Sequence, residues 1–517
     1  MSRAAALLKN PIVILLAVAL VTGLFLFRDF GLTWDEPLFY KYGDALGYAY
    51  NPANWFSGHF DLNYSYGPSG DDHKNRGPAW LLLAREPVYL LEDLGVDSAS
   101  GWHLLNFLCF LLGVYFIYRL AERLTARPAA VAAAALFAFQ PMLWGHAFIN
   151  PKDMPFLVFL TGSVWLGFRM VDQLLDQPGD LRRNFGRILL PGLFLGLATA
   201  NRVLGPLAGV LVAIYLLSRR PDWRTVLWLI PYAVLAALGM VVTWPYLWEG
   251  PSSLLNAVQF MSDNPTVLAV LFADHIYRAY DLPRRYLPSF LLLTLTECVW
   301  PLFLVAIAVA VRRLCTDRRR LAQVLLLLGW FAVPVLYVVV RRPPMYDGMR
   351  HFLFILPPVF ILISFAFDFL FARLKKPLLN AGLVAVLLAP GILGIVALHP
   401  YEYTYYNSFI GGTAGAFRHY ETDYWLTCYK QAVEAFNRLE SQPVKLYVHR
   451  EPDVAQPYAA SNVSILDERG AQSRVGAGDF VLVNSRTNED RQTFHDAPIL
   501  LSIGRGGATF CVIKSIP

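Results

Sequence analysis

Two adjacent carboxylates, Asp35 and Glu36, are the side chains of this sequence with the clearest potential for acid–base chemistry. They stand in the stretch Trp34-Asp35-Glu36-Pro37, a few residues beyond the first long apolar run, 11–27. An apolar wall and a neighbouring acid can raise the basicity of a carboxylate where a membrane helix meets water. Such a group can take a proton from an attacking hydroxyl. The alternative is structural, because Asp35 would also suit the cap of a helix that begins near Pro37.

Polar and cationic side chains in other connections would complete a site of this kind. Cations would hold a phosphate, acids would activate a hydroxyl, and nearby apolar grooves would take a lipid tail. Structural interpretations stay open here too. Lys152 and Asp153 would form a weak loop ion pair, and Arg350 would anchor a helix to lipid headgroups. The substrate-binding candidates are His73, Arg76, Lys152, Asp153, Arg202, Tyr346, Arg350 and His351.

These candidates are spread over a chain with the composition of a membrane protein. Of its 517 residues, 56% are hydrophobic and only 16% are charged, and the mean hydropathy is +0.43. Apolar runs long enough to cross a bilayer recur along the sequence. We therefore predict a polytopic, all-α membrane protein of the cell (inner) membrane. The formal net charge of +6 bears on its orientation, and no nucleic-acid partner is expected.

About eleven membrane-spanning helices are predicted. The fifth and sixth are short, and only residues 199–202 separate them. The predicted spans lie near 11–27, 102–118, 128–146, 154–171, 187–200, 203–218, 224–244, 287–311, 321–340, 350–372 and 378–398.

Basic residues concentrate in every second connection, as expected of a cytoplasmic face. This pattern places the N-terminus inside, and an odd number of spans then places the C-terminal tail outside. Asp35, Lys152 and Arg350 would all lie on the outer face. The basic connections contain Arg3, Lys9, Arg119, Arg123, Arg127, Arg182, Arg183, Arg187, Arg219, Arg220, Arg224, Arg312, Arg313, Arg318, Arg319, Arg320, Arg373, Lys375 and Lys376.

One outer connection departs from this trend. Residues 341–351 contain Arg341, Arg342 and Arg350 on the face where positive charge is usually scarce. An anionic ligand at the outer surface is the simplest reason for such a cluster.

Two domains are predicted, a transmembrane domain over 1–398 and a small extracytoplasmic α/β domain over 399–517. In the first, residues 28–100 form a long outer loop, and its stretches 37–50 and 78–94 suit helices along the membrane surface. In the second, 424–439 has helical spacing, whereas 444–448, 480–483 and 509–513 are typical of strands. Cys428 and Cys511 both fall outside the membrane in this scheme and could pair, which the sequence alone does not decide.

Three motifs in this order on the predicted outer face resemble the GT-C superfamily of membrane glycosyltransferases. They are Trp34-Asp35-Glu36-Pro37, Asn150-Pro151-Lys152-Asp153-Met154-Pro155 and Arg350-His351-Phe352-Leu353-Phe354-Ile355-Leu356-Pro357. The resemblance covers roughly residues 1–400. It is strongest to bacterial relatives of the dolichyl-phosphate-mannose protein mannosyltransferases and to lipid A aminoarabinose transferases.

The resemblance implies roles for individual residues. Asp35 resembles the catalytic carboxylate of the first outer loop, with Glu36 as its companion. Asp153 resembles the second-loop acid, Lys152 is a basic neighbour suited to phosphate, and Arg350 resembles the Arg that meets the donor phosphate. The large β-trefoil insertion of the eukaryotic protein mannosyltransferases is missing, which argues for a bacterial type.

The expected function is an inverting transfer of a sugar from a polyprenyl-phosphate-linked donor to a hydroxyl acceptor at the outer face. A divalent metal would have Asp153 as its candidate ligand, but no His or Cys set accompanies that residue. The alternative is a transporter or flippase for a polyprenyl-linked or other anionic lipid. Such a protein needs ionisable groups at the membrane midplane and usually an internal repeat, whereas here the charges gather at one face.

Overall fold

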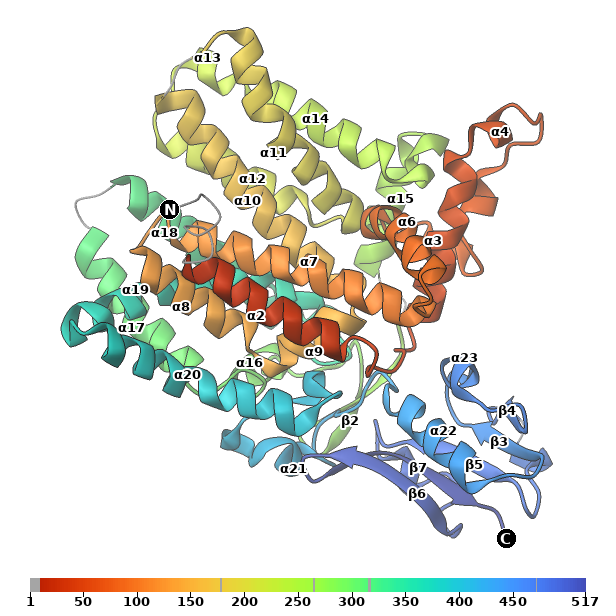
Figure 1. Cartoon of the computed structure of the whole chain (residues 1–517). Helices are drawn as coiled ribbons and strands as arrows, with labels where there is room; N and C mark the ends of the chain where they lie inside the picture. The colour runs from red at the N-terminus through yellow and green to blue at the C-terminus, as the bar shows by residue number, and fades with distance from the viewer. Residues whose placement is uncertain (1–9, 177–178, 264–265, 315–317, 471) are drawn as a thin grey trace.

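The computed structural model describes residues 10–176, 179–263, 266–314, 318–470 and 472–517. A bundle of long helices carries a small sheet domain at one end (Figure 1). Arg3 and Lys9, on which part of the predicted orientation depends, lie outside the described residues.

The helices of the bundle account for every predicted apolar run. Their bounds are α2 Pro11–Leu26, α7 Ser98–Ala121, α8 Arg127–Ala138, α9 Pro141–Ile149, α10 Asp153–Asp176, α11 Leu181–Asn201, α12 Pro206–Ser218, α13 Trp223–Val226, α14 Leu229–Val242, α16 Tyr286–Leu293, α17 Val299–Leu314, α18 Arg318–Arg341, α19 Leu356–Leu374 and α20 Pro377–Leu398.

The structure does not confirm the predicted number of spans. Within the described residues, six helices are long and apolar enough to cross a membrane, and α8 with α9, bent by 66°, makes a seventh. Helices α2 and α12 are apolar but short, with 16 and 13 residues. Residues 287–311 do not form one helix, because α16 ends at Leu293 and α17 begins at Val299. The count of about eleven spans is therefore not confirmed.

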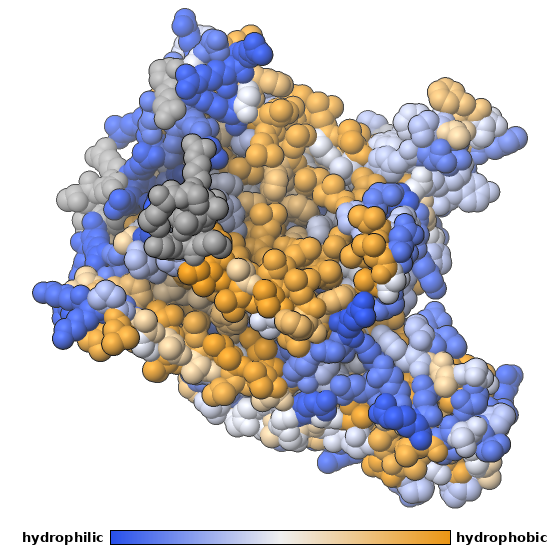
Figure 2. All heavy atoms as spheres, in the orientation of Figure 1, coloured by the Kyte–Doolittle hydropathy of each residue, from blue (hydrophilic) through white to orange (hydrophobic). Residues whose placement is uncertain are grey.

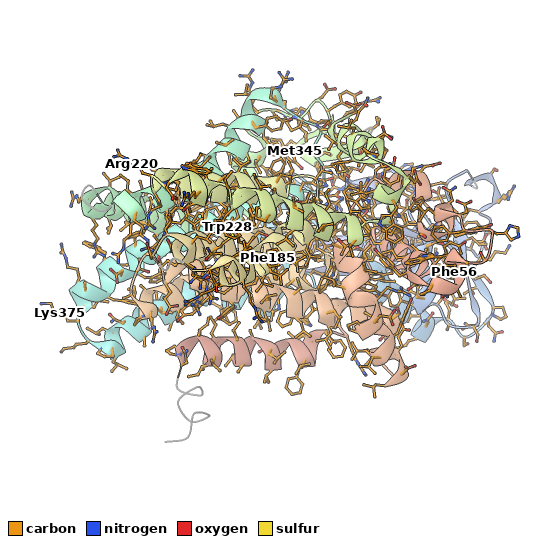
Figure 3. All side chains as sticks on the ribbon, turned by 90° about the horizontal axis from the view of Figure 1, so that it is seen from above. Phe56, Phe185, Arg220, Trp228, Met345 and Lys375 are labelled. Carbon is orange, nitrogen blue, oxygen red and sulfur yellow. A yellow bond between two sulfur atoms is a disulfide. The ribbon has the colours of Figure 1, made fainter. Side chains whose placement is uncertain are left out.

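On the face of the bundle that Figure 2 shows, polar residues lie toward both ends and apolar residues lie between them. Arg220 and Lys375 lie at one end, whereas Phe56 lies at the opposite end (Figure 3). At the basic end, Asp172 of α10 accepts charged hydrogen bonds from Arg123 at 2.5 Å and from Arg219 at 2.9 Å. The two sets of connections distinguished by their charge thus lie at opposite ends.

Helix α10 forms the centre of the bundle and links these two ends. Of its most apolar 18-residue stretch, 94% is buried. The helix packs against α7, α11 and α12. Its first residue is Asp153 and its last turns contain Asp172. A shift of this helix would therefore move Asp153 and Asp172, which lie at opposite ends of the bundle.

The residues predicted to form the long first outer loop fold into helices that cover the end of the bundle opposite the basic end (Figure 1). The main ones are α3, Glu36–Tyr50, and α6, Ala79–Asp93, close to the stretches expected to be helical; α4 Pro52–Trp55 and α5 Gly70–His73 are short. The connection between the predicted spans 224–244 and 287–311 contains α15, Ser252–Asp263. It also contains a hairpin that was not predicted, with β1 Ala269–Phe272 antiparallel to β2 His275–Arg278.

The C-terminal domain is a five-stranded mixed sheet covered by α22, Cys428–Leu439. Its strand order is β4-β3-β5-β7-β6, in which β3 pairs in parallel with β4 and with β5. A disulfide between Cys428 and Cys511 joins α22 to β7, with the Cα atoms 6.2 Å apart. Three predicted strands are present, while β4 and β6 were missed. The bounds are β3 Val444–Val448, β4 Val463–Asp467, β5 Phe480–Asn484, β6 Ile499–Arg505 and β7 Ala508–Ser515, with the short α21 Gly412–Ala416 and α23 Pro452–Ala455 before and between them.

Candidate active site

Asp35 and Arg350 form an ion pair between two elements that are 315 positions apart in the chain. Asp35 directly precedes α3, and Arg350 opens the short 3₁₀ helix that leads into α19. Arg350 Nη1 lies 2.8 Å from Asp35 Oδ2. The Arg350 guanidinium is buried between the rings of Tyr346 and Trp425, at 5.1 and 5.0 Å from their centroids. The Asp35 side chain stays 31% exposed, so a reactant can reach it.

Asp153 places a second carboxylate beside this pair. Asn150 prepares the start of α10, because its Oδ1 accepts the backbone N–H of Asp153 at 2.8 Å and its Nδ2 donates to Asp153 Oδ2 at 3.2 Å. Asp153 is buried and forms an ion pair with Arg202, which follows the last residue of α11. Arg350 Nη1 lies 3.8 Å from Asp153 Oδ2. The three predicted motifs therefore meet at one place.

A cavity of about 260 Å³ opens next to this cluster. Three of its lining side chains, Arg76, Lys152 and Arg202, are cationic, and none of the described residues that line it is acidic. The rest of the wall contains both polar and apolar side chains. It consists of Asn75, Gly77, Asn201, Val203, Leu204, Phe260, Met261, Ser262, Tyr337, Pro343, Pro344, Tyr346, His351 and Phe352.

The cations of this cavity are held close together in a buried setting. Burial, and then the neighbouring Arg202 and Arg76, lower the pKa of Lys152 well below its usual range. Burial, and then Arg350 and Arg76, lower the pKa of Arg202 to about 9. Lys152 Nζ also donates to the carbonyl of Gly77 at 2.7 Å. An anion in the cavity would relieve the mutual repulsion of these groups, so the electrostatics favour an anionic ligand.

The structure gathers most of the predicted site residues but not all of them. Asp35, Arg76, Lys152, Asp153, Arg202, Tyr346, Arg350 and His351 lie in the cluster or in the cavity wall. His73 is buried and stacks on Phe39 at 4.9 Å and on Tyr42 at 5.7 Å. Burial lowers its pKa to about 4, so it is neutral at neutral pH. His73 is thus a packed side chain of the predicted first outer loop, and it does not line the cavity.

Glu36 points away from its neighbour Asp35 into the interior of the loop. Its Oε2 accepts the backbone N–H of Thr33 at 2.6 Å, and its Oε1 lies 3.0 Å from His103 Nε2 and accepts the Tyr40 hydroxyl. The side chain is completely buried. These contacts fasten the start of α3 to α7 and so fix the direction of Asp35.

Two charged residues of the site escaped the sequence analysis. Asp347 lies 2.9 Å from Arg350 Nη2 through its Oδ2, and Arg486 of the C-terminal domain lies 2.7 Å from its Oδ1. Asp347 and the following Gly348 both adopt left-handed backbone, with φ of 56° and 63°. The Asp-Gly turn is a recognisable sequence feature, whereas nothing in the sequence around Arg486 connects it with the membrane domain.

A metal-binding role for Asp153 finds no ligand set in the part of the chain that the structure describes. No group of three or more His, Cys, Asp or Glu side chains is arranged to hold an ion there. The carboxylate of Asp153 is instead engaged with Arg202 and Asn150.

Comparisons with known proteins agree with this architecture. The family model of the dolichyl-phosphate-mannose-protein mannosyltransferases matches residues 90–248. The structure of ArnT from Cupriavidus metallidurans in the apo state is similar, with 14% identity, a TM-score of 0.50 and coverage of 99% of this chain and 98% of that one. The same protein bound to undecaprenyl phosphate gives 15% identity, a TM-score of 0.52 and 97% coverage of both chains.

A protein from another organism has a similar fold. The oligosaccharyltransferase of Archaeoglobus fulgidus in the apo form has 13% identity and a TM-score of 0.51, over 92% of this chain and 70% of that one. No curated protein sequence matches the chain. The chain thus resembles the dolichyl-phosphate-mannose-protein mannosyltransferases in sequence over residues 90–248, and it shares its fold with ArnT and with the Archaeoglobus fulgidus oligosaccharyltransferase.

Proposed function

We propose that this protein is an integral-membrane glycosyltransferase that moves a sugar from a polyprenyl-phosphate-linked donor to an acceptor hydroxyl at the outer face. The observation that carries this proposal is the cavity that combines Arg76, Lys152 and Arg202 with an apolar wall. It lies next to the carboxylate of Asp35, with Asp153 and Arg350 between them. An anionic headgroup attached to an apolar chain matches the cationic and the apolar side chains of this wall.

Asp35 is the general base in the proposed reaction. Its Oδ2 is engaged by Arg350, and its partial exposure leaves the second oxygen accessible to the acceptor hydroxyl. As the acceptor oxygen forms its bond to the anomeric carbon, its proton moves to Asp35. The bond between the anomeric carbon and the phosphate oxygen breaks, and its electron pair leaves with polyprenyl phosphate. Direct displacement inverts the anomeric centre without a covalent enzyme intermediate.

The cations of the site stabilise the leaving phosphate. A phosphodiester with a single negative charge becomes a phosphomonoester with a second one as the sugar departs, so the charge grows during the reaction. Arg350 can engage two phosphate oxygens with its planar fork, and Lys152 and Arg202 add charge from the cavity wall. Because these groups are buried and already fixed, their effect is largest where the negative charge develops.

The solved structures of similar fold support this choice of substrate class. One of them is ArnT bound to undecaprenyl phosphate, and another is the archaeal oligosaccharyltransferase AglB in complex with an inhibitory peptide and a dolichol phosphate. Both ligands are polyprenyl-type phosphates. We propose the same class for this chain, with the sugar and the acceptor still to be identified.

The distribution of charge favours an enzyme over a transporter. Between Asp153 at the site and Asp172 at the basic end, the central helix α10 contains one ionisable residue, Arg169, which is exposed. A transport path would need ionisable groups within the bundle near the midplane.

Mass spectrometry of envelope glycolipids and glycoproteins tests the proposal. We compare cells that contain the protein, cells that lack it, and cells with the Asp35→Asn variant. The proposal predicts that one hexose, pentose or uronic acid is absent from a defined glycan in the second and third strains. Identical envelopes in the first two strains, grown under conditions in which the protein is made, would contradict it.

A further inference from the structure

We infer that Arg486 of the C-terminal domain is a positioning residue of the transferase site, which holds Asp347 and Trp34 so that Arg350 and Asp35 face the reactants. This inference rests on the proposed function and assigns the C-terminal domain a part in it. The domain would then be a structural component of the active site and not only an appendage to the bundle.

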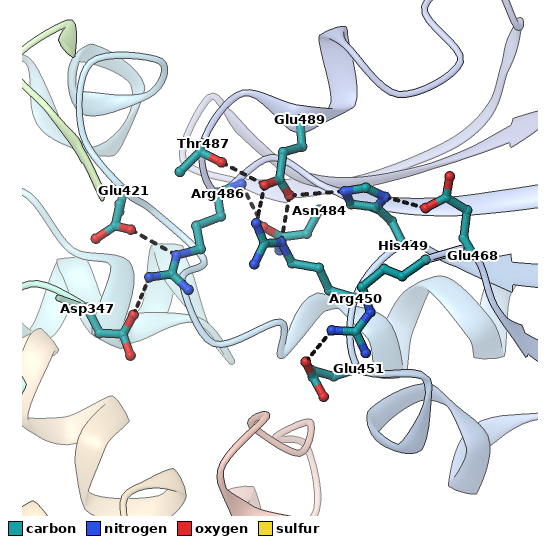
Figure 4. Close-up of polar contacts among 11 residues, drawn as sticks. Asp347, Glu421, His449, Arg450, Glu451, Glu468, Asn484, Arg486, Thr487 and Glu489 are labelled. Carbon is teal, nitrogen blue, oxygen red and sulfur yellow. Dashed lines mark hydrogen bonds and ion pairs between the residues drawn. The ribbon is translucent and has the colours of Figure 1, made fainter. Parts of the chain in front are cut away.

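Arg486 lies two residues after the central strand β5, and its side chain extends out of the C-terminal domain to Asp347. Its backbone N–H donates to Asn484 Oδ1 at 2.6 Å, and Asn484 Nδ2 donates to the carbonyl of Asp423 at 3.1 Å, which fixes the turn. The guanidinium is 1% exposed. Its Nε donates to Glu421 Oε1 at 2.9 Å and its Nη2 to Asp347 Oδ1 at 2.7 Å (Figure 4).

The same guanidinium also contacts the loop that carries the proposed base. Its central carbon lies 4.4 Å from the centroid of the Trp34 ring, and Trp34 is the direct neighbour of Asp35. A cation over the face of a Trp ring is attractive, and more so where both are removed from water. Arg486 therefore links the loop before α3 to the loop before α19.

Asp347 transmits the position of Arg486 to Arg350. Its Oδ1 is bound by Arg486 and its Oδ2 by Arg350 Nη2 at 2.9 Å. Because Arg486 occupies Oδ1, only Oδ2 of Asp347 is left for Arg350, and it contacts the single nitrogen Nη2. Arg350 Nη1 meanwhile lies 2.8 Å from Asp35 Oδ2 and 3.8 Å from Asp153 Oδ2.

The charges along this path alternate in sign, in the order Glu421, Arg486, Asp347, Arg350 and Asp35. Removal of Arg486 would leave two buried acids, Glu421 and Asp347, short of a counter-charge. Such acids take up protons or attract other cations. Arg350 would then turn further toward Asp347 and away from the phosphate. The effect should reach the site without any change in the side chains that contact the substrate.

Arg450 provides a matched control. It lies two residues after the neighbouring strand β3 and is half-buried, and its Nε pairs with Glu489 Oε2 at 2.8 Å within the C-terminal domain. Figure 4 shows both arginines, with Arg486 directed to Glu421 and Asp347 and Arg450 directed to Glu489. The Arg450→Gln variant breaks a comparable ion pair of the same domain.

The experiment uses the purified full-length protein and measures turnover in sugar transfer together with the affinity for undecaprenyl phosphate. We expect Arg486→Gln to lower turnover by about 10²-fold, as a small misplacement of reacting groups does, and to weaken undecaprenyl phosphate binding. For Arg486→Lys, which can keep one contact, turnover and affinity should lie between those of Arg486→Gln and those of the wild-type protein. Arg450→Gln should leave both quantities unchanged. Equal losses in Arg450→Gln and Arg486→Gln would overturn the inference.

A double-mutant cycle with Asp347→Asn separates positioning from general destabilisation. If Arg486 acts through Asp347, the double variant binds undecaprenyl phosphate no more weakly than Asp347→Asn alone, because coupled residues are not additive. Additive losses would overturn the inference. If Arg486→Gln does not fold, the Arg486→Lys variant is used as the test. Wild-type turnover and wild-type affinity for undecaprenyl phosphate in Arg486→Lys would then overturn the inference. A wild-type protein that neither binds nor transfers would instead refute the proposed function.

Discussion

The carboxylate of Asp35 has one oxygen on Arg350 and a partly exposed side chain, which is the arrangement expected of a base that must be both oriented and accessible. Asp35→Asn keeps the shape and an oxygen for Arg350 but cannot take up the proton. We expect turnover to fall by about 10²–10⁴-fold, with unchanged affinity for undecaprenyl phosphate and unchanged abundance in the membrane. Wild-type turnover in the purified variant would exclude Asp35 as the base.

Glu36→Gln serves as the comparison for Asp35→Asn, because it removes the neighbouring charge. The Glu36 carboxylate is buried against Thr33, Tyr40 and His103. Its loss should therefore lower thermal stability and have a milder effect on turnover than Asp35→Asn.

Substitutions of Arg350 distinguish a role in phosphate binding from a role as an anchor to lipid headgroups. Its planar guanidinium can bind two phosphate oxygens, whereas an ammonium offers a point charge. We expect Arg350→Lys to reduce transfer and Arg350→Ala to reduce it further. Part of the loss should appear in turnover, because the phosphate gains charge in the transition state. Steady-state kinetics against donor concentration measure both parts, and unchanged kinetics with Lys would refute the phosphate role.

At the level of single residues, the sequence allowed the charged motifs to be predicted but not the direction of each side chain. Asp35, Lys152, Asp153 and Arg350 could be chosen because charge beside an apolar run is costly and therefore informative. Glu36 was paired with Asp35 because they are neighbours, but the turn into α3 sends their side chains in different directions. The contribution of Arg486 depends on a contact between distant parts of the chain, which no local pattern reveals.

At the scale of secondary-structure elements, the close packing of helices α11 and α14 supports the position of Arg202 in the site. Helix α11 ends directly before Arg202 and packs against α14 through Gly196. A Cβ atom at Gly196 would lie 2.5 Å from the carbonyl oxygen of Ala236 and 2.9 Å from the backbone nitrogen of Met240. Backbone atoms cannot move aside locally, so the two helices would have to separate. Small residues at such a crossing allow the closest approach of helices.

We therefore expect Gly196→Ala to lower the melting temperature of the detergent-solubilised protein and to weaken undecaprenyl phosphate binding. Gly186→Ala in the same helix is the control, since nothing lies within 4 Å of its added Cβ. That variant should be neutral or slightly stabilising, because Ala is about 1 kcal/mol more favourable than Gly within a helix. Equal melting temperatures for the two variants would contradict the packing argument.

Hydropathy located the helices well but could not count the spans. Every predicted run falls on helix, yet α8 and α9 are bent and residues 287–311 are interrupted. Glu297, expected within the eighth span, lies in that interruption, where its Oε1 accepts the backbone N–H of Ser408 at 2.8 Å. A break of this kind depends on tertiary partners for the freed backbone groups, which a window average does not contain.

For the whole molecule, the orientation stays a prediction from the positive-inside rule. It can be tested with single cysteines in a background that keeps the Cys428–Cys511 disulfide and lacks the other cysteines. We expect an exposed Ser461→Cys to react with a membrane-impermeant reagent in intact cells. An exposed Arg182→Cys at the basic end should react only after permeabilisation. The reverse pattern would turn the site toward the cytoplasm and exclude an outer-face reaction.

The junction between bundle and C-terminal domain gives the stability a pH dependence. His399 Nδ1 lies 2.7 Å from Glu402 Oε1, and its Nε2 lies 3.0 Å from Asp29 Oδ2. Burial lowers the pKa of His399, but the two carboxylates outweigh it and raise this pKa above 6.5. A raised His pKa stabilises the fold fully below about pH 6.5 and loses that effect as the pH rises through the folded value. Burial raises the pKa of Glu402, which acts in the same direction.

The melting temperature should therefore fall from pH 6 to pH 9, and His399→Gln should flatten this dependence. Differential scanning measurements of both proteins across this range provide the test. An identical slope in the variant would show that His399 does not cause it.

The contacts between the first outer loop and the C-terminal domain also determine when the protein becomes competent during its synthesis. The backbone N–H of Leu32 donates to the hydroxyl of Tyr458, 426 positions later, and the N–H of Trp34 donates to the carbonyl of Trp425. The residues of the three motifs emerge from the ribosome long before these partners exist. A chain that stops after α20 would contain Asp35, Asp153 and Arg350 but would lack the contacts that hold Leu32 and Trp34 to the C-terminal domain. We expect the site to mature only after translation is complete, so that unfinished copies in the membrane remain inert.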